Sequence, residues 1–571
     1  MSVFYNGRLL ISPVVASRID DSAMRNRNLT VGNILAIVGQ CDGGQPATAL
    51  RFGDPSDART VLRSGDLMTA VERAFDPSPQ LNAPSTVIAV RVNPATQAAL
   101  TLKDAGAANV IDLKSTDYGL HTNQIKVKVE TGTNKGKKLT TTFGTDFYVQ
   151  DDVYRDAFSI QYTGGQATAI MTVNNTTVTL EAPTGTPVAT IDLNTYSTIR
   201  QLVDFINTVA DFTSAVLDGN DNKPALNGLD AVTAQDVKSA SYTAVANLQA
   251  AIDWFNGVGE GFIDATRVAA GTLPPANIAD TYLSGATNGV VTNNEWQAGF
   301  DALKVEDVQW VVPLSSDPSI QVMAETHASF MSDVSRMERR ALAGGASAEG
   351  TAVALANAKA LNSDRISIVS PGYYDYDAAG KLTLYPTYMS AALVAAGFAG
   401  SDPGTPLTNK ALSVRGLETK YKNPTDTDVL IEGGVLALED TPQGYKVVKS
   451  ITTWLVNDNY NRVEVSTGFA TDFTARNVRE ALQDLIGRKG SPITLIEAKS
   501  RTDTALRELS RPEPAGPGVL VGDETNPPFK NIRVSLVGDV LRVEFEASPV
   551  IPVNYVLTSI HIVPFQGSIA A

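Results

Sequence analysis

The sequence predicts a multidomain protein of the α/β plus β class, with a discontinuous α/β domain, an inserted β-rich region and an α+β C-terminal domain. Three observations predict this fold class. Apolar strands alternate with amphipathic helices on both sides of a long run of short strands separated by turns. The 571 residues exceed what one hydrophobic core accommodates. The chain also ends in a strongly patterned β-hairpin.

The first part of the α/β domain spans residues 21–103. We expect buried strands at 34–39 and 86–92, because both are continuous apolar runs of strand length, and a helix at 64–75. This strand–helix–strand order with apolar strands is typical of a parallel sheet.

Residues 104–269 follow a different pattern and are interpreted as one or more inserted β-rich domains on the outside of the protein. Short strands separated by Gly, Asn and Thr turns are expected here, together with helices at 197–209 and 237–255.

The α/β pattern resumes over residues 270–439. The spacing of apolar residues predicts three helices and three buried strands. The helices are expected at 295–303, 319–340 and 388–398, and the strands at 308–313, 366–369 and 435–438.

The C-terminal domain, residues 440–571, is expected to hold helices at 472–487 and 492–510 before the hairpin. Gly538-Asp539 is a suitable two-residue turn. One register places apolar side chains on one face and Arg533 opposite Glu544 on the other. Its apolar pairs are Val537–Val540, Leu536–Leu541, Val534–Val543 and Ile532–Phe545.

Both ends of the chain are apolar arms. The N-terminal arm, residues 1–20, carries Val3, Phe4, Tyr5, Leu9 and Ile11, and the C-terminal arm, residues 555–571, carries Val556, Leu557, Ile560 and Ile562. The prolines that precede the C-terminal arm disfavour a direct hairpin return, so its strand is expected to join a sheet that need not be its own. An ordinary first strand is the alternative for the N-terminal arm.

Composition excludes several functions. With 46 Lys+Arg against 61 Asp+Glu, the net charge of −15 argues against nucleic acid as a partner. No apolar run is long enough for membrane insertion, and no signal peptide is indicated. The single cysteine fits folding in a reducing cytoplasm.

Three short segments resemble known binding or catalytic motifs, but none matches the full motif. Residues 132–138 lack the glycine spacing and hydroxyl residue of a phosphate loop. The loop around Asp218 lacks the glycine and glutamate of a calcium site, and the segment around Ser347 lacks the second glycine of a nucleophile elbow. His327 is interpreted as a core histidine. We therefore predict no catalytic residue, cofactor or metal.

Several stretches together resemble the tail sheath proteins of contractile-tailed bacteriophages. The resemblance is carried by residues 118–127, 283–289 leading into Trp296, 391–403 and 451–454, and by the terminal hairpin with its following strand. It implies a subtilisin-like fold without protease chemistry for the α/β domain. It also implies arms exchanged as strands between subunits, with the hairpin residues above and both arms as the contact set.

The resemblance further implies a subunit that polymerises as hexameric rings around a tail tube and contracts to drive that tube through the host envelope. Tube, baseplate and tail terminator proteins are the implied partners, and the virion tail, assembled in the host cytoplasm, is the implied location. The sheath of a phage-tail-like bacteriocin or injection particle is an alternative. Subtilisin-like hydrolases and generic shell proteins are alternatives of a different class.

Attachment to an acidic tube is predicted for basic residues on the two helices before the hairpin. These are Arg476, Arg479, Arg488, Lys489, Lys499, Arg501 and Arg507. The alternative is that they pair with local carboxylates such as Glu480, Glu497 and Glu508.

Overall fold

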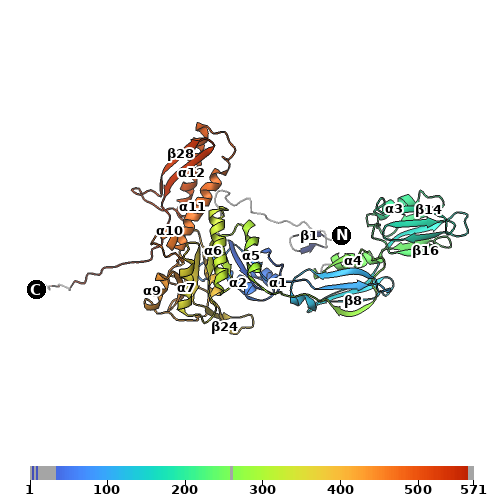
Figure 1. The fold of residues 1–571 in the computed structure, drawn as a ribbon, viewed down its shortest axis with the longest axis horizontal. Helices are drawn as coiled ribbons and strands as arrows, with labels where there is room; N and C mark the ends of the chain where they lie inside the picture. Colours follow the sequence, from blue (N-terminus) through green and yellow to red (C-terminus); the bar gives the residue numbers. More distant parts are fainter. Residues whose placement is uncertain are drawn as a thin grey trace.

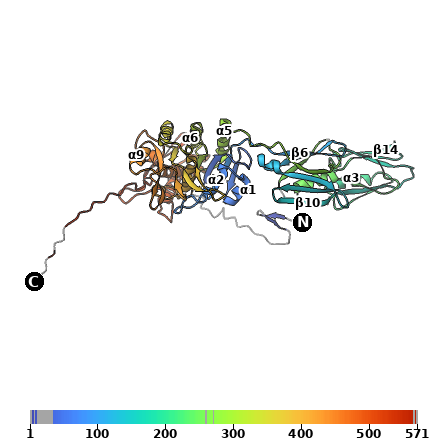
Figure 2. The same ribbon diagram turned by 90° about the horizontal axis from the view of Figure 1, so that it is seen from below.

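The computed structural model describes residues 3–5, 8–10, 34–257, 261–269, 271–563 and 567. An α/β domain occupies the middle of the molecule, a β-rich insertion projects from it to one side, and a C-terminal helix–hairpin unit stands on its other end (Figure 1). The turned view shows the insertion as an elongated extension and the C-terminal segment leaving the body in the opposite direction (Figure 2).

The α/β domain is built on one eight-stranded sheet of order β27-β26-β22-β21-β20-β3-β5-β4. Its six central strands are parallel and its two edge strands antiparallel. The parallel strands are β3 (Ile34–Gly39), β5 (Thr86–Arg91), β20 (Trp310–Pro313), β21 (Arg340–Ala343), β22 (Ile366–Ser370) and β26 (Val435–Thr441). The edges are β4 (Ala49–Phe52) and β27 (Gly444–Val447). The parallel sheet predicted from the sequence is confirmed.

Helices cover both faces of this sheet because its central strands are apolar on both sides. In β3, Leu35 and Ile37 face one core while Ala36 and Val38 face the other. The first core is completed by α1 (Pro55–Leu62), α2 (Asp66–Ala74) and α8 (Thr387–Ala399). The second is completed by α5 (Asn293–Ala302), α6 (Pro318–Asp333), α7 (Thr351–Leu361) and α9 (Thr425–Glu432).

The predicted helix at 319–340 is wrong at its C-terminal end. Helix α6 stops at Asp333, Arg336 adopts a left-handed φ of 61°, and β21 begins at Arg340. The apolar spacing continues through this turn, and β21 contains no β-branched residue, so the pattern gave no sign of a strand.

The insertion contains two modules with separate hydrophobic cores. The proximal module holds sheets β18-β7-β6 and β10-β9-β8-β19 with α4 (Asn247–Gly257). Beside β6 and β19, its strands are β7 (Asn109–Ser115), β8 (Lys126–Thr131), β9 (Lys137–Phe143), β10 (Asp146–Val153) and β18 (Ile263–Arg267). The distal module holds sheets β15-β11-β17 and β14-β13-β12-β16 with α3 (Ile199–Ile206). Beside β11 and β17, its strands are β12 (Ile170–Val173), β13 (Thr177–Glu181), β14 (Pro187–Asp192), β15 (Phe212–Val216) and β16 (Val232–Asp236). Asp230 of the distal module accepts the backbone N–H groups of Asn247 and Leu248, each at 3.0 Å, and so caps α4 of the proximal module.

The strands of the proximal module extend past the predicted limits 104 and 269. Its sheets include β6 (Ala99–Lys103) and β19 (Ile278–Tyr282). The predicted helix at 237–255 is also wrong in its first half, because β17 (Tyr242–Val245) pairs with β11 (Asp156–Tyr162) before α4 begins. Thr243 and Val245 favour a strand, and the paired strand β11 supplies the hydrogen bonds.

The C-terminal unit consists of α11 (Val465–Gln483), α12 (Pro492–Leu509), β28 (Phe529–Val537) and β29 (Val540–Ala547). Helix α11 begins before the predicted residue 472, and its first turns bury Val465 and Phe469 in the core of the α/β domain. The helix therefore joins the two parts of the molecule.

At the N-terminus, β1 (Val3–Tyr5) pairs antiparallel with β2 (Arg8–Leu10). Ile11 and the rest of the predicted N-terminal arm lie outside the described residues. Among the helices that the structure describes, none combines the length and apolar character of a membrane span.

Candidate functional site

The terminal hairpin adopts the predicted register from its turn to Arg533. Gly538 has a φ of 63°, which the first position of this two-residue turn requires and glycine adopts without strain. The confirmed pairs are Val537–Val540, Leu536–Leu541, Val534–Val543 and Arg533–Glu544.

The predicted pair Ile532–Phe545 is not a regular ladder pair, because β28 contains one extra residue at this point. The register shifts between Lys530 and Arg533, so Asn531 and Ile532 both stand opposite Phe545. Asn531 has a φ of 58° and donates its side-chain amide to Glu546 at 2.8 Å. Asparagine tolerates this conformation, and a strict alternation of residues cannot reveal such a bulge.

Both outer edges of the hairpin are open within the part of the chain that the structure describes, because β28 and β29 pair only with each other. Residues that flank a two-residue turn exchange both backbone hydrogen bonds, so the next pair points its N–H and C=O groups outwards. In this register, Val534 and Leu536 present free backbone groups along one edge, and Leu541 and Val543 present them along the other.

The C-terminal arm forms no strand in the described chain and extends away from the body (Figures 1 and 2). Its predicted contact residues are almost fully exposed: Val556 is 79%, Leu557 96%, Ile560 83% and Ile562 91% exposed. Burying an aliphatic side chain of this size stabilises a contact by about 1.5–3 kcal/mol, so the arm carries a large unused capacity for binding.

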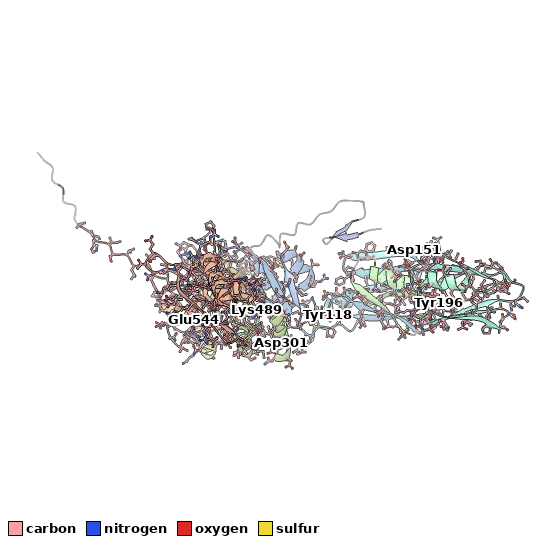
Figure 3. All side chains as sticks on the ribbon, turned by 90° about the horizontal axis from the view of Figure 1, so that it is seen from above. Tyr118, Asp151, Tyr196, Asp301, Lys489 and Glu544 are labelled. Carbon is pink, nitrogen blue, oxygen red and sulfur yellow. The ribbon has the colours of Figure 1, made fainter. Side chains whose placement is uncertain are left out.

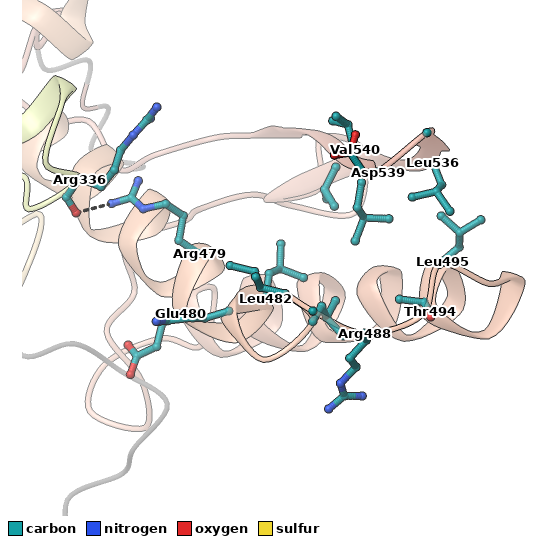
Figure 4. A pocket seen from close by; sticks show the side chains of 18 of the residues that line it. Arg336, Arg479, Glu480, Leu482, Arg488, Thr494, Leu495, Leu536, Asp539 and Val540 are labelled. Carbon is teal, nitrogen blue, oxygen red and sulfur yellow. Dashed lines mark hydrogen bonds between the residues drawn. The ribbon is translucent and has the colours of Figure 1, made fainter.

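A groove of about 1400 Å³ runs between the hairpin and the helix pair. Its apolar wall includes Leu482 of α11, Leu495 of α12 and Leu536 of β28. Figure 4 shows Leu495 facing Leu536 across the groove, while Arg488 points away from it. The hairpin thus packs on the helices at its base and stands off them near its turn.

Two of the predicted tube-binding arginines hold the C-terminal unit on the α/β domain. Arg476 pairs with Asp307, and only 11% of its side chain is exposed. Arg479 donates to Glu338 at 2.6 Å and to the carbonyl oxygen of Arg336 at 3.1 Å (Figure 4). These two side chains are engaged inside the subunit.

Three more of these arginines pair with carboxylates on their own helices or the neighbouring helix, which is the alternative stated in the sequence analysis. Glu497 accepts from Arg488 at 2.9 Å and from Arg501 at 2.8 Å, and Asp503 accepts from Arg507 at 2.6 Å. The two lysines of the predicted set differ from these five arginines. Lys489 and Lys499 are exposed and form no ion pair with the residues described in the structure.

His327 is a core residue, as predicted. Its Nε2 lies 3.0 Å from Nη1 of Arg339, and its ring centroid lies 5.5 Å from that of Phe300, with the two rings tilted by 33°. Burial and the Arg339 charge lower its pKa to about 3, so the imidazole is neutral. Ser347 lies in the loop between β21 and α7, and His327 makes no hydrogen bond to it. Over the described residues, no group of His, Cys, Asp and Glu has the arrangement of a metal site.

Two of the stretches that carried the family resemblance, residues 118–127 and 283–289, meet at the junction of the insertion and the α/β domain. The buried Arg91 donates to the carbonyl oxygen of Tyr118 at 2.8 Å and to the side-chain oxygen of Asn288 at 3.2 Å. Asn123 and Ala286 exchange two hydrogen bonds of 2.9 Å. Figure 3 shows Tyr118 in the narrow connection between the two parts. No sequence pattern indicated that these distant segments form one hydrogen-bonded joint.

The fold is that of tail sheath proteins. It aligns with the sheath tail protein from Desulfitobacterium hafniense at a TM-score of 0.55 and 12% identity, covering 94% of this chain and 96% of that chain. The sheath tail protein from Listeria innocua aligns at a TM-score of 0.55 and 12% identity, covering 91% and 92%.

The sequence comparisons point to the same class. Residues 289–453 match the phage tail sheath protein central domain. The chain is 29% identical to the tail sheath protein of Bacillus phage SP01, covering 99% of this chain and 98% of that protein. It is 28% identical to a putative tail sheath protein of Enterococcus phage phiEF24C, covering 94% of each. The predicted resemblance to phage tail sheath proteins is confirmed.

Proposed function

We propose that this chain is the structural subunit of a contractile phage tail sheath. It polymerises as hexameric rings stacked around the tail tube and contracts to drive the tube through the host envelope. Tube, baseplate and tail terminator proteins are its partners in the virion tail, and assembly takes place in the host cytoplasm. The observation that carries this function is the combination of an open-edged hairpin with an exposed apolar arm in one chain.

Strand addition links the two features. An arm of one copy supplies backbone N–H and C=O groups to an open edge of another copy's hairpin, at about 1 kcal/mol net per hydrogen bond. Its alternating side chains add apolar burial and set the register. Each link is modest, but repetition along a lattice holds subunits together while their bodies slide during contraction. The N-terminal arm is proposed to act in the same way.

Removal of the arms tests this assembly. Deleting residues 555–571, or residues 1–12, should leave a folded monomer that forms no sheath-like tubes in negative-stain electron microscopy. A finer variant replaces Ile560 and Ile562 by Asp, which charges one apolar face of the arm, with Ser559→Asp as the matched control. Tubes of normal length from either deletion would rule out strand exchange through that arm.

Tube attachment is proposed to depend on Lys489 and Lys499, the predicted basic residues that remain without an internal partner among those the structure describes. Exposed charges bind weakly, respond to salt and tolerate sliding, which suits a tube that must be released. The double variant Lys489→Glu/Lys499→Glu should form sheath without co-sedimenting tube. Lys381→Glu, an exposed lysine of the α/β domain, serves as the control. Unchanged co-sedimentation and salt sensitivity of the double variant would place the attachment surface elsewhere.

The alternative within the same class is the sheath of a phage-tail-like bacteriocin or injection particle. A subunit of such a sheath would assemble in the same way, so the two functions are distinguished by the particle in which the chain is found. A hydrolytic function is not favoured, because the Nε2 atom of His327 contacts Arg339 and His327 makes no hydrogen bond to Ser347. Covalent labelling of Ser347 by a fluorophosphonate that is lost on unfolding would revive that alternative.

A further inference from the structure

The insertion carries an open strand edge of its own. Strand β10 is the last strand of the sheet β10-β9-β8-β19 and, within the described chain, pairs only with β9. It lies along one side of the insertion (Figure 2), and residues 146–151 are all exposed. The side chain of Phe147 is 66% exposed and that of Val149 49%. An exposed apolar edge strand is a ready template for pairing with another chain.

The register of β9 and β10 determines which backbone groups of β10 point outwards. Residues 144–145 form a two-residue turn that is flanked by Phe143 and Asp146, and the first turn residue is a glycine with a φ of 61°. Residues that flank such a turn exchange both hydrogen bonds. Phe147 and Val149 therefore direct their N–H and C=O groups away from β9. No other part of the described chain forms a backbone hydrogen bond with them.

Three other edge strands of the molecule are protected against such pairing. Strand β4 contains Arg51, and β27 contains Lys446. The edge of β15 is covered by Asn207, whose side chain exchanges hydrogen bonds of 2.9 Å and 2.8 Å with the backbone of Ser214. Residues 147–150 of β10 include neither a charged residue nor a proline. This edge therefore lacks the usual devices that prevent pairing with another chain.

The edge of β10 is complementary to itself. Two antiparallel strands form ladder hydrogen bonds where outward-pointing residues face each other. A pair of β10 strands centred on Tyr148 places Phe147 of one copy opposite Val149 of the second copy, and each such pair exchanges both of its hydrogen bonds. An aromatic and a β-branched side chain then lie side by side on one face, which is a favourable cross-strand combination.

Charges select this register over its neighbours. Centring on Tyr148 places Asp146 opposite Gln150 of the second copy, so no carboxylate faces another. Centring on Val149 would place Asp146 opposite Asp152, and like charges directly opposite are destabilising. Centring on Phe147 would place Val149 opposite the turn, where no ladder forms.

We propose that β10 is a docking strand for a second copy of this chain, paired antiparallel about Tyr148. The two sheets join into one across a two-fold axis, which is the geometry of an isologous contact. The contact is small and therefore weak, so the chain is monomeric when dilute and dimeric when concentrated. A two-fold contact does not build a stack with one direction, so it joins free subunits and is independent of the proposed sheath.

Oxidative cross-linking of the free full-length chain tests the contact and its register. In Tyr148→Cys the two thiols face each other in a non-hydrogen-bonded pair, with about 4.5 Å between Cα atoms, and should form a disulfide-linked dimer. Gln150→Cys is the matched control on the same face of the strand. Its two copies lie about 13 Å apart along the strand in this register, so it should cross-link at least about tenfold more slowly. The natural Cys41 is buried and 3% exposed.

Sedimentation velocity measures the strength of the contact. The sedimentation coefficient of the natural free chain should rise with concentration. Val149→Pro removes an outward-pointing N–H, leaves the ladder with β9 intact and should weaken dimerisation by about tenfold or more. Gln150→Lys faces Asp146 and should tighten the dimer about two- to tenfold, whereas Gln150→Glu should weaken it. Thr190→Lys, on the exposed face of β14, adds the same charge elsewhere and should behave as the natural chain.

Equal cross-linking rates of the two cysteine variants, or a natural chain that stays monomeric at every concentration, would overturn the proposal. Circular dichroism checks that Val149→Pro is folded. Where it is not, the two Gln150 variants decide: opposite shifts support the register, and equal shifts exclude it. Deletion of the C-terminal arm should leave the cross-link unchanged, so loss of tubes and loss of the dimer are separate results.

Discussion

At the scale of single residues, the parts of this molecule are joined by buried charges. Asp472 of α11 accepts from Arg340 of β21 at 3.0 Å and from Arg365 at 2.8 Å. Arg340 is 3% exposed and Asp472 7%, so water screens neither charge. Nothing in the sequence singles out these residues, because Arg340 and Asp472 are 132 positions apart and each fits an exposed helix equally well.

Replacing Asp472 by Ala should destabilise the chain by about 3–5 kcal/mol, since it removes the carboxylate that pairs with two buried guanidinium groups. The free energy of unfolding of the monomer, measured by urea titration, checks this value. Asp503→Ala, which removes the partner of the exposed Arg507, is the matched control and should cost less than about 0.5 kcal/mol. Equal effects of the two variants would show that Asp472 is not a structural counter-charge.

At the scale of elements, α11 shows tertiary packing overriding local preference. Its first turns contain Val465, Ser466, Thr467 and Gly468, residues that form isolated helices poorly, and the predicted helix accordingly starts at 472. The helix nevertheless begins at Val465, because these turns are buried against the α/β domain. Burial of a helix in a neighbouring domain leaves no local signal.

The variant Gly468→Ala tests whether helix propensity or tertiary packing dominates the stability of α11. Helix propensity alone predicts a gain of about 1 kcal/mol. An added Cβ, however, would lie 2.7 Å from the carbonyl oxygen of Asn461 and would also collide with the Arg340 side chain. We therefore expect a loss of about 1–3 kcal/mol in the free energy of unfolding.

The control for this variant is Gly257→Ala at the end of α4, where an added Cβ meets no atom within 4 Å. It should leave stability unchanged or slightly raised. Stabilisation by Gly468→Ala would mean that the start of α11 is less tightly packed than the structure indicates.

At the scale of the whole molecule, the insertion is a separate structural unit attached through one joint. Its two cores share no residue with those of the α/β domain. The chain enters and leaves at neighbouring points, where Thr96 donates its backbone N–H to the carbonyl oxygen of Thr287 at 3.0 Å. An insertion with adjacent ends can be removed without stretching its host.

Replacing residues 97–286 by a short Gly/Ser linker should leave a folded chain that still forms tubes in negative-stain electron microscopy. Replacing only 104–269, the limits predicted from sequence, should instead give aggregation, because β6 and β19 lose their partner strands. Size-exclusion chromatography separates the two outcomes. Misfolding of the 97–286 replacement would show that the α/β domain depends on the insertion.

Features that repeat over short distances were predictable from the amino-acid sequence alone. Alternation in residues 533–544 gave the hairpin register, and apolar runs gave five of the six parallel strands, because burial of one or both faces leaves a local periodicity. The C-terminal arm was also recognisable in the sequence as an apolar segment without a local partner strand, and its role as a contact between subunits stays a prediction.

The three-dimensional fold was needed to show which charged residues form ion pairs inside the subunit and where the chain departs from regular spacing. The pairing of Arg476 and Arg479 with the α/β domain depends on residues brought together from distant positions, and the bulge at Asn531 depends on a single left-handed backbone angle. Electrostatic pairing and burial of polar groups act through space, so no periodicity along the chain encodes them.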